Sequence, residues 1–595
     1  MKRNKLTKIT LLIFILLLTV GVELLFARAG GGGSRSGSSG GGDLGAIYLI
    51  FYLLRIIPFP FNIIVIGLVV FFYFKASSKA KKDGSAFRNF PMQKNSDNVT
   101  GYADFLNNNP DFSESEFIKK VSTAFMDIQK AWTEKNISKA RRYISDGVHQ
   151  RFLTQLTMMD MLKQTDQISN IDIHNIWIDK VEQDGDFDII HAGISAYADD
   201  IFKSELSKSL NSDVSEDFIE YWSFIRKKGS NKKANLYGTV ECPNCKAPLD
   251  GKNSDVVKCT FCGTLLNNGE YDWILSEITQ ANDYAASRTS RKKIDHVASE
   301  ITKTAFGEES SVQLLEDKAS NAYLQIISAL SLNKIEKIKR FVSESYWKKL
   351  ESVKTGNSIA YNRIFLNDVS LIGAGKTEND NLLYISIRSS FQRIKILEKN
   401  RISKIDPFVV SKTEVLIFKK AIDGGKSKGS LYAGSCPACG APVEDELAAK
   451  CSYCGTAYNR GTKDWVVENI ISMEEYAGIS SKEMTSSVKA AVIDGVYDIK
   501  DYAMNNIMMI IAADGKFDSR ERQLAETIAN KFGYKTNIIE PLFKQAASGR
   551  LSIKMPEDRK KREKIYSLMF KAAMADNKLS SEESRLLDEV KKVYL

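Results

Sequence analysis

The sequence is poor in the groups that most enzymes use for acid–base and nucleophilic chemistry. Only four histidines occur among 595 residues: His149, His174, His191 and His296. None lies at a motif spacing from a serine, cysteine or carboxylate that would indicate a catalytic group. A glycine-rich phosphate loop followed by lysine is also missing, because the glycine runs at 31–33 and 40–42 lie in a linker. We therefore expect that the protein is not an enzyme, and we identify no small-molecule substrate.

The sequence also lacks a strong charge of either sign. The formal net charge is +10, with 26% charged and 43% hydrophobic residues, which is ordinary for a globular protein. This mild excess suggests affinity for acidic surfaces such as anionic lipid, without requiring it. A chain of 595 residues is long enough for several domains.

Cysteine is confined to two short stretches, and all eight cysteines lie in C-x-x-C pairs. The pairs are Cys242/Cys245 with Cys259/Cys262, and Cys436/Cys439 with Cys451/Cys454. Two such turns facing each other complete a tetrahedral four-sulfur site, which suits Zn²⁺. Gly263 and Gly455, which follow the second pairs, allow the turn conformation. We predict zinc ribbons at residues 240–265 and 434–457; redox pairs or disulfides are the alternative.

The two zinc ions are expected to be structural, because a four-cysteine site leaves no open position for a substrate. Thiolate sites also indicate a reducing compartment. Basic runs precede both ribbons, so contact with nucleic acid stays an alternative, although such runs are more often solvated linkers. These basic residues are Arg226, Lys227, Lys228, Lys232 and Lys233 before the first ribbon, and Lys419, Lys420, Lys426 and Lys428 before the second.

The first hundred residues are predicted to contain a membrane anchor. Residues 1–29 resemble a signal peptide or a first membrane helix, and residues 30–43 form a Gly/Ser-rich linker. Residues 44–74 are apolar and long enough to cross a bilayer. The basic juxtamembrane linker at 75–109 places this end inside by the positive-inside rule. We expect residues 75–595 to be cytoplasmic, at a bacterial inner membrane.

A long stretch of the chain occurs twice. The segment from Val121 aligns without a gap to the segment from Ala319, and each reads as a helix, a break near Asn136 or Asn333, and a second helix. Strand signals with alternating apolar residues follow in each copy, and then a ribbon. After the ribbons, YDWILSEI and KDWVVENI are predicted to be helices, with Trp273 and Trp465 packing them against the sheet.

The first copy resembles the Tim44-like family, whose founding member anchors the mitochondrial import motor to the inner membrane. Residues 110–280 carry the resemblance, and zinc ribbons depart from the mitochondrial protein. The family implies a curved antiparallel sheet over helices around an apolar concavity, membrane association, scaffolding and no catalytic residues. The positions that fit the family pattern are Phe117, Ala124, Phe125, Ile128, Gln129, Trp132, Tyr143 and Ser145.

Residues 485–595 form a cysteine-free, mostly helical pattern with its own short repeat. Asp518 with Glu521, and Ser580 with Glu583, fit capping boxes. The segment resembles the TerB-like tellurite-resistance family, whose acidic turns imply a divalent cation such as Ca²⁺. The alternative is that the acids only cap helices. The candidate ligands are Asp514, Asp518, Glu521, Asp576, Glu582 and Glu583.

The sequence thus predicts an α+β, membrane-anchored multidomain protein. Two cone-like, helix-on-antiparallel-sheet domains (110–290 and 300–480) each carry a zinc ribbon, and an all-α bundle (485–595) follows. We expect an adaptor that docks a partner protein at the inner face of the membrane, in protein transport or envelope stress. A nucleic-acid- or ribosome-binding protein and a lipid-binding or transporter accessory component are the alternatives.

Overall fold

The computed structural model describes most of the chain from residue 99 onward. The residues left out are 1–98, 231–233, 239–240, 250–256, 281–282, 285–288, 307–310, 353–357, 426, 444, 446, 480–483, 497–498, 514–516, 518, 532–538, 540–542, 544–545, 547–551 and 575–578. The predicted membrane segments, 1–29 and 44–74, therefore lie outside the described residues. Among the residues that are described, no helix combines the length and apolar character needed to cross a membrane.

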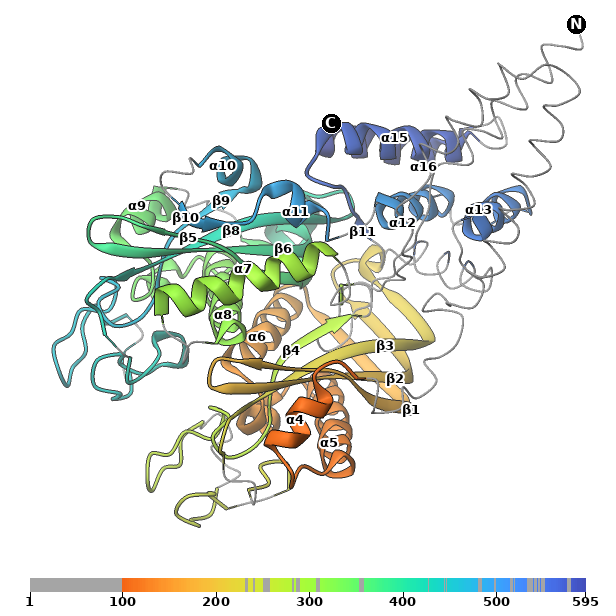
Figure 1. The fold of residues 1–595 in the computed structure, drawn as a ribbon. Helices are drawn as coiled ribbons and strands as arrows, with labels where there is room; N and C mark the ends of the chain where they lie inside the picture. Colours follow the sequence, from red (N-terminus) through yellow and green to blue (C-terminus); the bar gives the residue numbers. More distant parts are fainter. Residues whose placement is uncertain are drawn as a thin grey trace, which may run out of the picture.

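Residues 99–280, the first unit, place helices on one face of an antiparallel sheet with the strand order β1-β2-β3-β4 (Figure 1). Its elements are α4 (Tyr102–Asn108), α5 (Glu114–Thr133), the 3₁₀ turn η2 (Ile137–Tyr143), α6 (Asp146–Met161), β1 (Gln164–Asp184), β2 (Phe187–Ser204), η3 (Lys208–Leu210), β3 (Ser212–Lys227) and β4 (Ile274–Gln280).

The helix α5 forms where the sequence predicts it, for local reasons. The side chain of Ser113 caps its N-terminus by accepting the Glu116 amide. Apolar residues then recur every three or four positions, so one face of the helix is buried against the sheet. The buried apolar residues of this face are Phe117, Val121, Ala124, Phe125, Ile128, Ala131 and Trp132.

Residues 289–479, the second unit, repeat this order of elements. The elements are α7 (Thr289–Phe306), α8 (Val312–Ser331), η4 (Ile335–Ile338), α9 (Glu344–Ser352), β5 (Ile359–Lys376), β6 (Asp380–Ile396), η5 (Glu398–Asn400), β7 (Ile402–Lys404), β8 (Val409–Ala421), η6 (Leu431–Ala433), β9 (Val466–Ser472) and α10 (Met473–Gly478). The units differ before the repeated pair, where the second has the 18-residue α7 and the first has the 7-residue α4. The short strand β7 is present in the second unit only, among the described residues. The predicted helix–break–helix pattern is confirmed in both units, with Lys135 and Asn333 adopting positive φ at the breaks.

The predicted helices after the ribbons are wrong, because YDWILSEI and KDWVVENI contain the strands β4 and β9. Each adds antiparallel to the strand before the ribbon, β4 to β3 and β9 to β8. Hydrogen bonds to a partner distant in sequence therefore decide the conformation. Trp273 packs against α5, with its ring 5.4 Å from that of Phe117, and Trp465 lies 6.3 Å from Phe418.

The C-terminal segment, residues 484–595, is mostly helical and packs on the second unit (Figure 1). Its elements are β10 (Met484–Ser487), α11 (Ala490–Asp494), α12 (Ile499–Ile511), α13 (Ser519–Lys531), β11 (Ser552–Ile553), α15 (Arg559–Ala573) and α16 (Ser581–Tyr594). The expectation of an all-α bundle is wrong, because β10 pairs antiparallel with β5 and β11 pairs parallel with β8. Buried side chains of α12, α15 and α16 also join the core of the second unit.

Candidate functional site

The four cysteines of each ribbon converge on one point. Their sulfur atoms lie within 4.8 Å of one another in each set. In the first ribbon, Sγ atoms are 3.7 Å apart for Cys242 and Cys262 and 3.6 Å apart for Cys245 and Cys259. The second ribbon has the same geometry, with 3.7 Å for Cys436–Cys454 and for Cys439–Cys451.

This geometry fits the zinc ion that the sequence predicts. A tetrahedral site with Zn–S bonds of about 2.3 Å places its sulfur atoms roughly 3.8 Å apart. The observed separations match that value, and the donor set is made of four soft sulfur atoms in each case. Both groups can therefore hold Zn²⁺, and neither leaves a protein-defined open position for a substrate.

Backbone geometry explains why each C-x-x-C stretch holds its thiols together. In each turn the residue after the second cysteine donates its amide to the carbonyl of the first cysteine, at 2.8 Å from Gly263 to Cys259 and 2.9 Å from Gly455 to Cys451. These residues adopt positive φ, which glycine tolerates best. Lys246, at a φ of 64°, occupies this position in the first turn, where the second ribbon has Gly440.

In each ribbon, a threonine hydroxyl favours the thiolate form of one cysteine. The hydroxyl of Thr264 lies 3.1 Å from Cys262 Sγ and lowers the pKa of that thiol. Thr456 has the same place beside Cys454, at 3.3 Å, with the same effect on its pKa. A thiol with a lowered pKa releases its proton more readily to a metal ion.

A four-residue anchor at the base of each ribbon was not found from the sequence. In the first unit, Lys120 on α5 pairs with Asp272 at 2.5 Å, and Asp272 accepts the Leu236 amide at 2.9 Å. Tyr237 donates to the Trp273 carbonyl at 2.8 Å. The Asp-Trp pair after each ribbon is the sequence signal that points to this anchor.

The same anchor recurs in the second unit. Lys318 pairs with Asp464, and Tyr432 donates to the Trp465 carbonyl at 2.8 Å. The side chains of Asp272 and Asp464 are each 2% exposed, so removing either lysine would leave a buried carboxylate uncompensated. Each ribbon is thus anchored to one helix of its own unit, α5 or α8, and to the residues just before the last strand, β4 or β9.

The ribbons carry exposed apolar side chains, and they contact each other. Phe261 is 66% exposed and Tyr453 is 59% exposed, at equivalent positions inside the second C-x-x-C of each ribbon. Leu447 in the second ribbon is also 59% exposed. Lys258 Nζ of the first ribbon donates to the Gly440 carbonyl of the second at 3.1 Å. This hydrogen bond brings the two ribbons into contact.

Most described residues of the basic runs have partners inside the protein. Arg226 is buried, donates to Asn109 at 3.1 Å and stacks over Trp273 at 4.4 Å. Four lysines of the two runs also have acceptors within the protein. Lys227 pairs with Glu270 and Lys419 with Glu468, whereas Lys228 donates to the Gly185 carbonyl and Lys420 to the Gly425 carbonyl. Lys232, Lys233 and Lys426 lie outside the described residues.

The predicted acidic site near the C-terminus is only partly described. Asp514, Asp518 and Asp576 lie outside the described residues. Glu583 completes the predicted capping box with Ser580, accepting its amide at 2.8 Å, and Glu582 accepts a hydroxyl from Ser581. Within the described part of the chain, the groups suited to a metal ion are the two cysteine sets, so Ca²⁺ has no support there.

A carboxylate group of each unit caps the N-terminus of a helix in the other unit. Asp184 at the end of β1 accepts the amides of Val312 and Gln313, each at 2.9 Å, at the start of α8. Asp317 on α8 in turn accepts the Gly147 amide at 3.0 Å, at the start of α6. An anion at a helix N-terminus satisfies free amides and the helix dipole.

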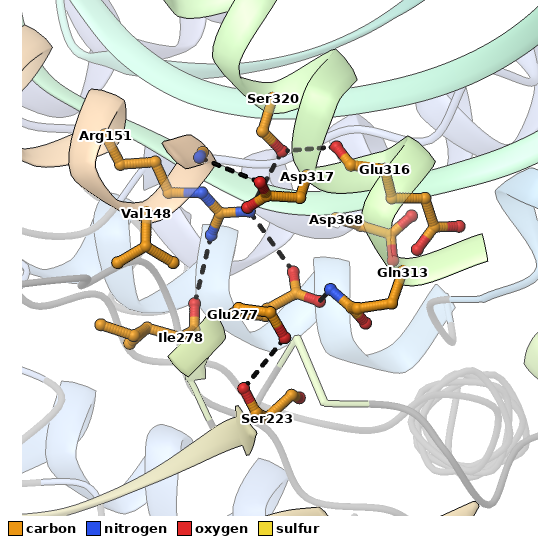
Figure 2. Close-up of polar contacts among 12 residues, drawn as sticks. Val148, Arg151, Ser223, Glu277, Ile278, Gln313, Glu316, Asp317, Ser320 and Asp368 are labelled. Atoms are coloured by element: carbon orange, nitrogen blue, oxygen red, sulfur yellow. Dashed lines mark hydrogen bonds and ion pairs between the residues drawn. The ribbon is translucent and has the colours of Figure 1, made fainter. Parts of the chain in front are cut away.

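A polar network continues this joint between α6 and α8, and Figure 2 shows it. Arg151 donates to the Ile278 carbonyl at 3.4 Å, to Ser320 at 3.3 Å and to Glu277 at 3.5 Å. Next to it lies a cavity of about 300 Å³ lined mainly by polar side chains of both units. This cavity is not the apolar concavity that the family resemblance implies.

Comparison with known proteins gives one family match. Residues 99–236 match the model of the Tim44-like domain. The match ends just before the first ribbon, so it covers the helices and the first three strands of the first unit. Comparison with curated proteins and with solved structures gives no match.

Proposed function

We propose, from the Tim44-like match over residues 99–236, that this protein is an adaptor that docks a partner protein at the inner face of a bacterial membrane. The match is the observation that carries the proposal, because the Tim44-like domain suggests a membrane-associated adaptor role in general. The apolar run at 44–74 and the basic residues after it support membrane anchoring with residues 75–595 in the cytoplasm. Anionic lipid would assist the attachment.

The ribbons are proposed as the contact surface for the partner, each held by one structural Zn²⁺. Their exposed aromatic side chains, Phe261 and Tyr453, support this role, since aromatic residues are enriched in protein interfaces. The Lys258–Gly440 contact supports a surface built from both ribbons at once. Docking of this kind requires no turnover at the zinc sites.

The proposal also includes the origin of the second unit and the family of the C-terminal segment. The recurrence of the Lys-Asp-Tyr-Trp anchor supports an origin of both units by duplication of one ancestral unit with its ribbon. Assignment of residues 485–595 to the TerB-like family rests on the sequence motif around Asp514 and Asp576. A role in protein transport or envelope stress would follow from these two resemblances.

Nucleic acid is the less favoured partner. Binding to phosphate requires free lysine and arginine side chains, whereas the described basic residues before the ribbons mostly have internal acceptors. Within 240–265 the charges also balance, with Lys246, Lys252 and Lys258 against Glu241, Asp250 and Asp255. Neither feature resembles a dedicated basic patch.

The test is crosslinking in cells, followed by purification of the full-length protein in detergent and counting of bound zinc. A double variant, Phe261→Ser with Tyr453→Ser, should retain two zinc ions and lose a specific protein partner. Phe570→Ser is the matched control, because Phe570 is 46% exposed on α15, away from the ribbons. RNA or ribosomal protein that is released at high salt would replace the adaptor proposal with nucleic-acid binding, and a copurifying lipid would indicate a lipid-binding component.

A further inference from the structure

Three polar side chains from neighbouring strands meet on the outer face of the first sheet. They are Glu182 on β1, His191 on β2 and Ser223 on β3. His191 lies directly opposite Ser223 in the strand register, and Glu182 pairs with Ile189, two residues before His191. Because side chains alternate along a strand, all three point to the face opposite α5. No sequence motif links these residues, because only strand pairing brings them together.

Their hydrogen bonds form a relay in which a neutral His191 ring can link the carboxylate to the serine hydroxyl. Glu182 Oε1 lies 2.7 Å from His191 Nε2, and His191 Nδ1 lies 2.9 Å from Ser223 Oγ. Burial opposes ionisation of Glu182, but the His191 ring and Lys180 hold the pKa of this carboxyl well below its usual range. In the neutral form of His191, an ionised Glu182 accepts the proton on Nε2, so Nδ1 has a lone pair that accepts the Ser223 hydroxyl.

The relay lines the cavity of about 300 Å³ between the two units. The opposite wall is formed by α7, α8 and β5 through residues such as Arg291, Glu316 and Asp368. Tyr284 also lines the cavity, stacked on Tyr221 at 3.9 Å. A hydroxyl, a hydrogen-bonded base and an orienting carboxylate beside a cavity are the parts of a nucleophilic site.

We propose that Ser223, His191 and Glu182 form an acyl-transfer site for small esters or amides that carry a cationic group. Ser223 Oγ forms a bond to the substrate carbonyl carbon as its proton passes to His191 Nδ1. The alcohol or amine leaves with that proton, and an acyl-serine is left. Water then attacks the acyl group, gives a proton to His191 and releases the acid with Ser223 restored. Glu182 is a positioning residue, which holds the imidazole in the required tautomer.

The cavity lining indicates the substrate class and contains a hydroxyl and a guanidinium group as candidate donors to an oxyanion. Carboxyl groups outnumber lysine and arginine in the lining, so a substrate with an amine or quaternary ammonium group is favoured. Burial raises the pKa of the Tyr284 hydroxyl well above its usual value, so that hydroxyl stays a proton donor. Arg291 stays cationic because Asp295 and Asp368 raise its pKa against the effect of burial. These two donors line the same cavity as Ser223.

The experiment treats the full-length protein with a fluorophosphonate probe, whose phosphorus bonds to a reactive serine oxygen as fluoride leaves. Peptide mass spectrometry should find the adduct on Ser223. His191→Gln should slow labelling at least ten-fold, and Ser223→Ala should remove it. Ser195→Ala is the matched control: Ser195 is buried on the same face of β2 and is not in the cavity lining, so labelling of Ser223 should be unchanged.

A second measurement separates chemistry from structure. Hydrolysis of a choline thioester should exceed that of a matched neutral thioester, and Glu182→Gln should lower kcat and alter the pH profile with little change in KM. Circular dichroism establishes that the variants are folded. Absence of an adduct on Ser223 in the folded wild-type protein, or equal labelling of His191→Gln, would show that the relay is only a buried polar network and overturn the proposal.

Discussion

At the scale of single residues, Asp317 shows how one buried carboxyl group joins the two units. It accepts hydrogen bonds from Ser145 Oγ at 2.5 Å and from the Gly147 amide at 3.0 Å, both in the first unit. Burial raises its pKa to about 7, and the nearby Asp146 adds to the rise while Arg151 opposes it. The joint therefore contains a group that changes its charge near neutral pH.

The pH dependence of stability should reveal this group. Because the folded-state pKa exceeds the usual value of about 3.9 for the unfolded chain, the folded state binds the proton more tightly. Its contribution is complete below about pH 4 and is lost as pH rises through about 7, at up to about 1.4 kcal/mol per pH unit. Asp317→Asn should remove this loss, and urea unfolding between pH 4.5 and 8 measures it. Asp160→Asn, at an exposed carboxylate, is the control, and an identical slope in both variants would contradict the assignment.

At the scale of elements, each ribbon is a long excursion between two paired strands. The first leaves β3 at Lys227 and returns at Ile274 to form β4. The small cluster at its base, made of Ile189, Ile225, Leu236, Leu266 and Ile274, is too small to hold such a loop without another constraint. Zinc would supply that constraint, because a metal that binds only the folded state stabilises it.

Replacing one ligand should therefore destabilise one ribbon and spare the other. Cys242→Ser should lower bound zinc from two ions to one and make residues 234–273 more sensitive to protease. The second ribbon should stay loaded, because its four ligands come from 436–454 alone. Inductively coupled plasma mass spectrometry and limited proteolysis measure these effects, with Cys436→Ser as the mirror variant. Unchanged protease resistance after loss of one zinc ion would show that the metal is not structural.

At the scale of the whole molecule, the two units and the C-terminal segment form a connected body. Asp283, just after β4, accepts the side-chain amide of Asn367 on β5 at 3.1 Å and lies 3.6 Å from Lys554 next to β11. The helices α6 and α8 lie between the two sheets (Figure 1). The joint combines these polar contacts with apolar packing, because Met158, Leu162 and Leu210 of the first unit join the core of the second. Its stability therefore depends on satisfied hydrogen bonds as well as on buried apolar area.

The reciprocal caps give a test of this joint. Asp184→Ala removes the acceptor for Ser311, Val312 and Gln313, and should lower the free energy of unfolding by about 1–2 kcal/mol. Hydrogen exchange should accelerate at the Val312 and Gln313 amides in the second unit, although the substitution is in the first. Asp184→Asn keeps an oxygen acceptor and should have a smaller effect. Equal exchange in wild type and Asp184→Ala would mean that the cap does not hold the units together.

Several features of this protein depend only on local patterns of residues and could be predicted before the fold was known. These features follow from neighbouring residues, because capping, turn formation and C-x-x-C geometry are local. They are the helix caps at Ser113 and Ser580, the turn at Gly185 and the convergence of the cysteines. Family resemblance in the first unit also agrees with the Tim44-like match.

Strand pairing decided the features that local pattern does not specify. It made β4 and β9 from segments with helix-like spacing, and it brought Glu182, His191 and Ser223 together. The packing of the two units also placed Asp184 of the first unit at the start of α8 and Asp317 of the second unit at the start of α6. Such contacts could not be predicted, because residues distant in sequence leave no periodic signal in either partner.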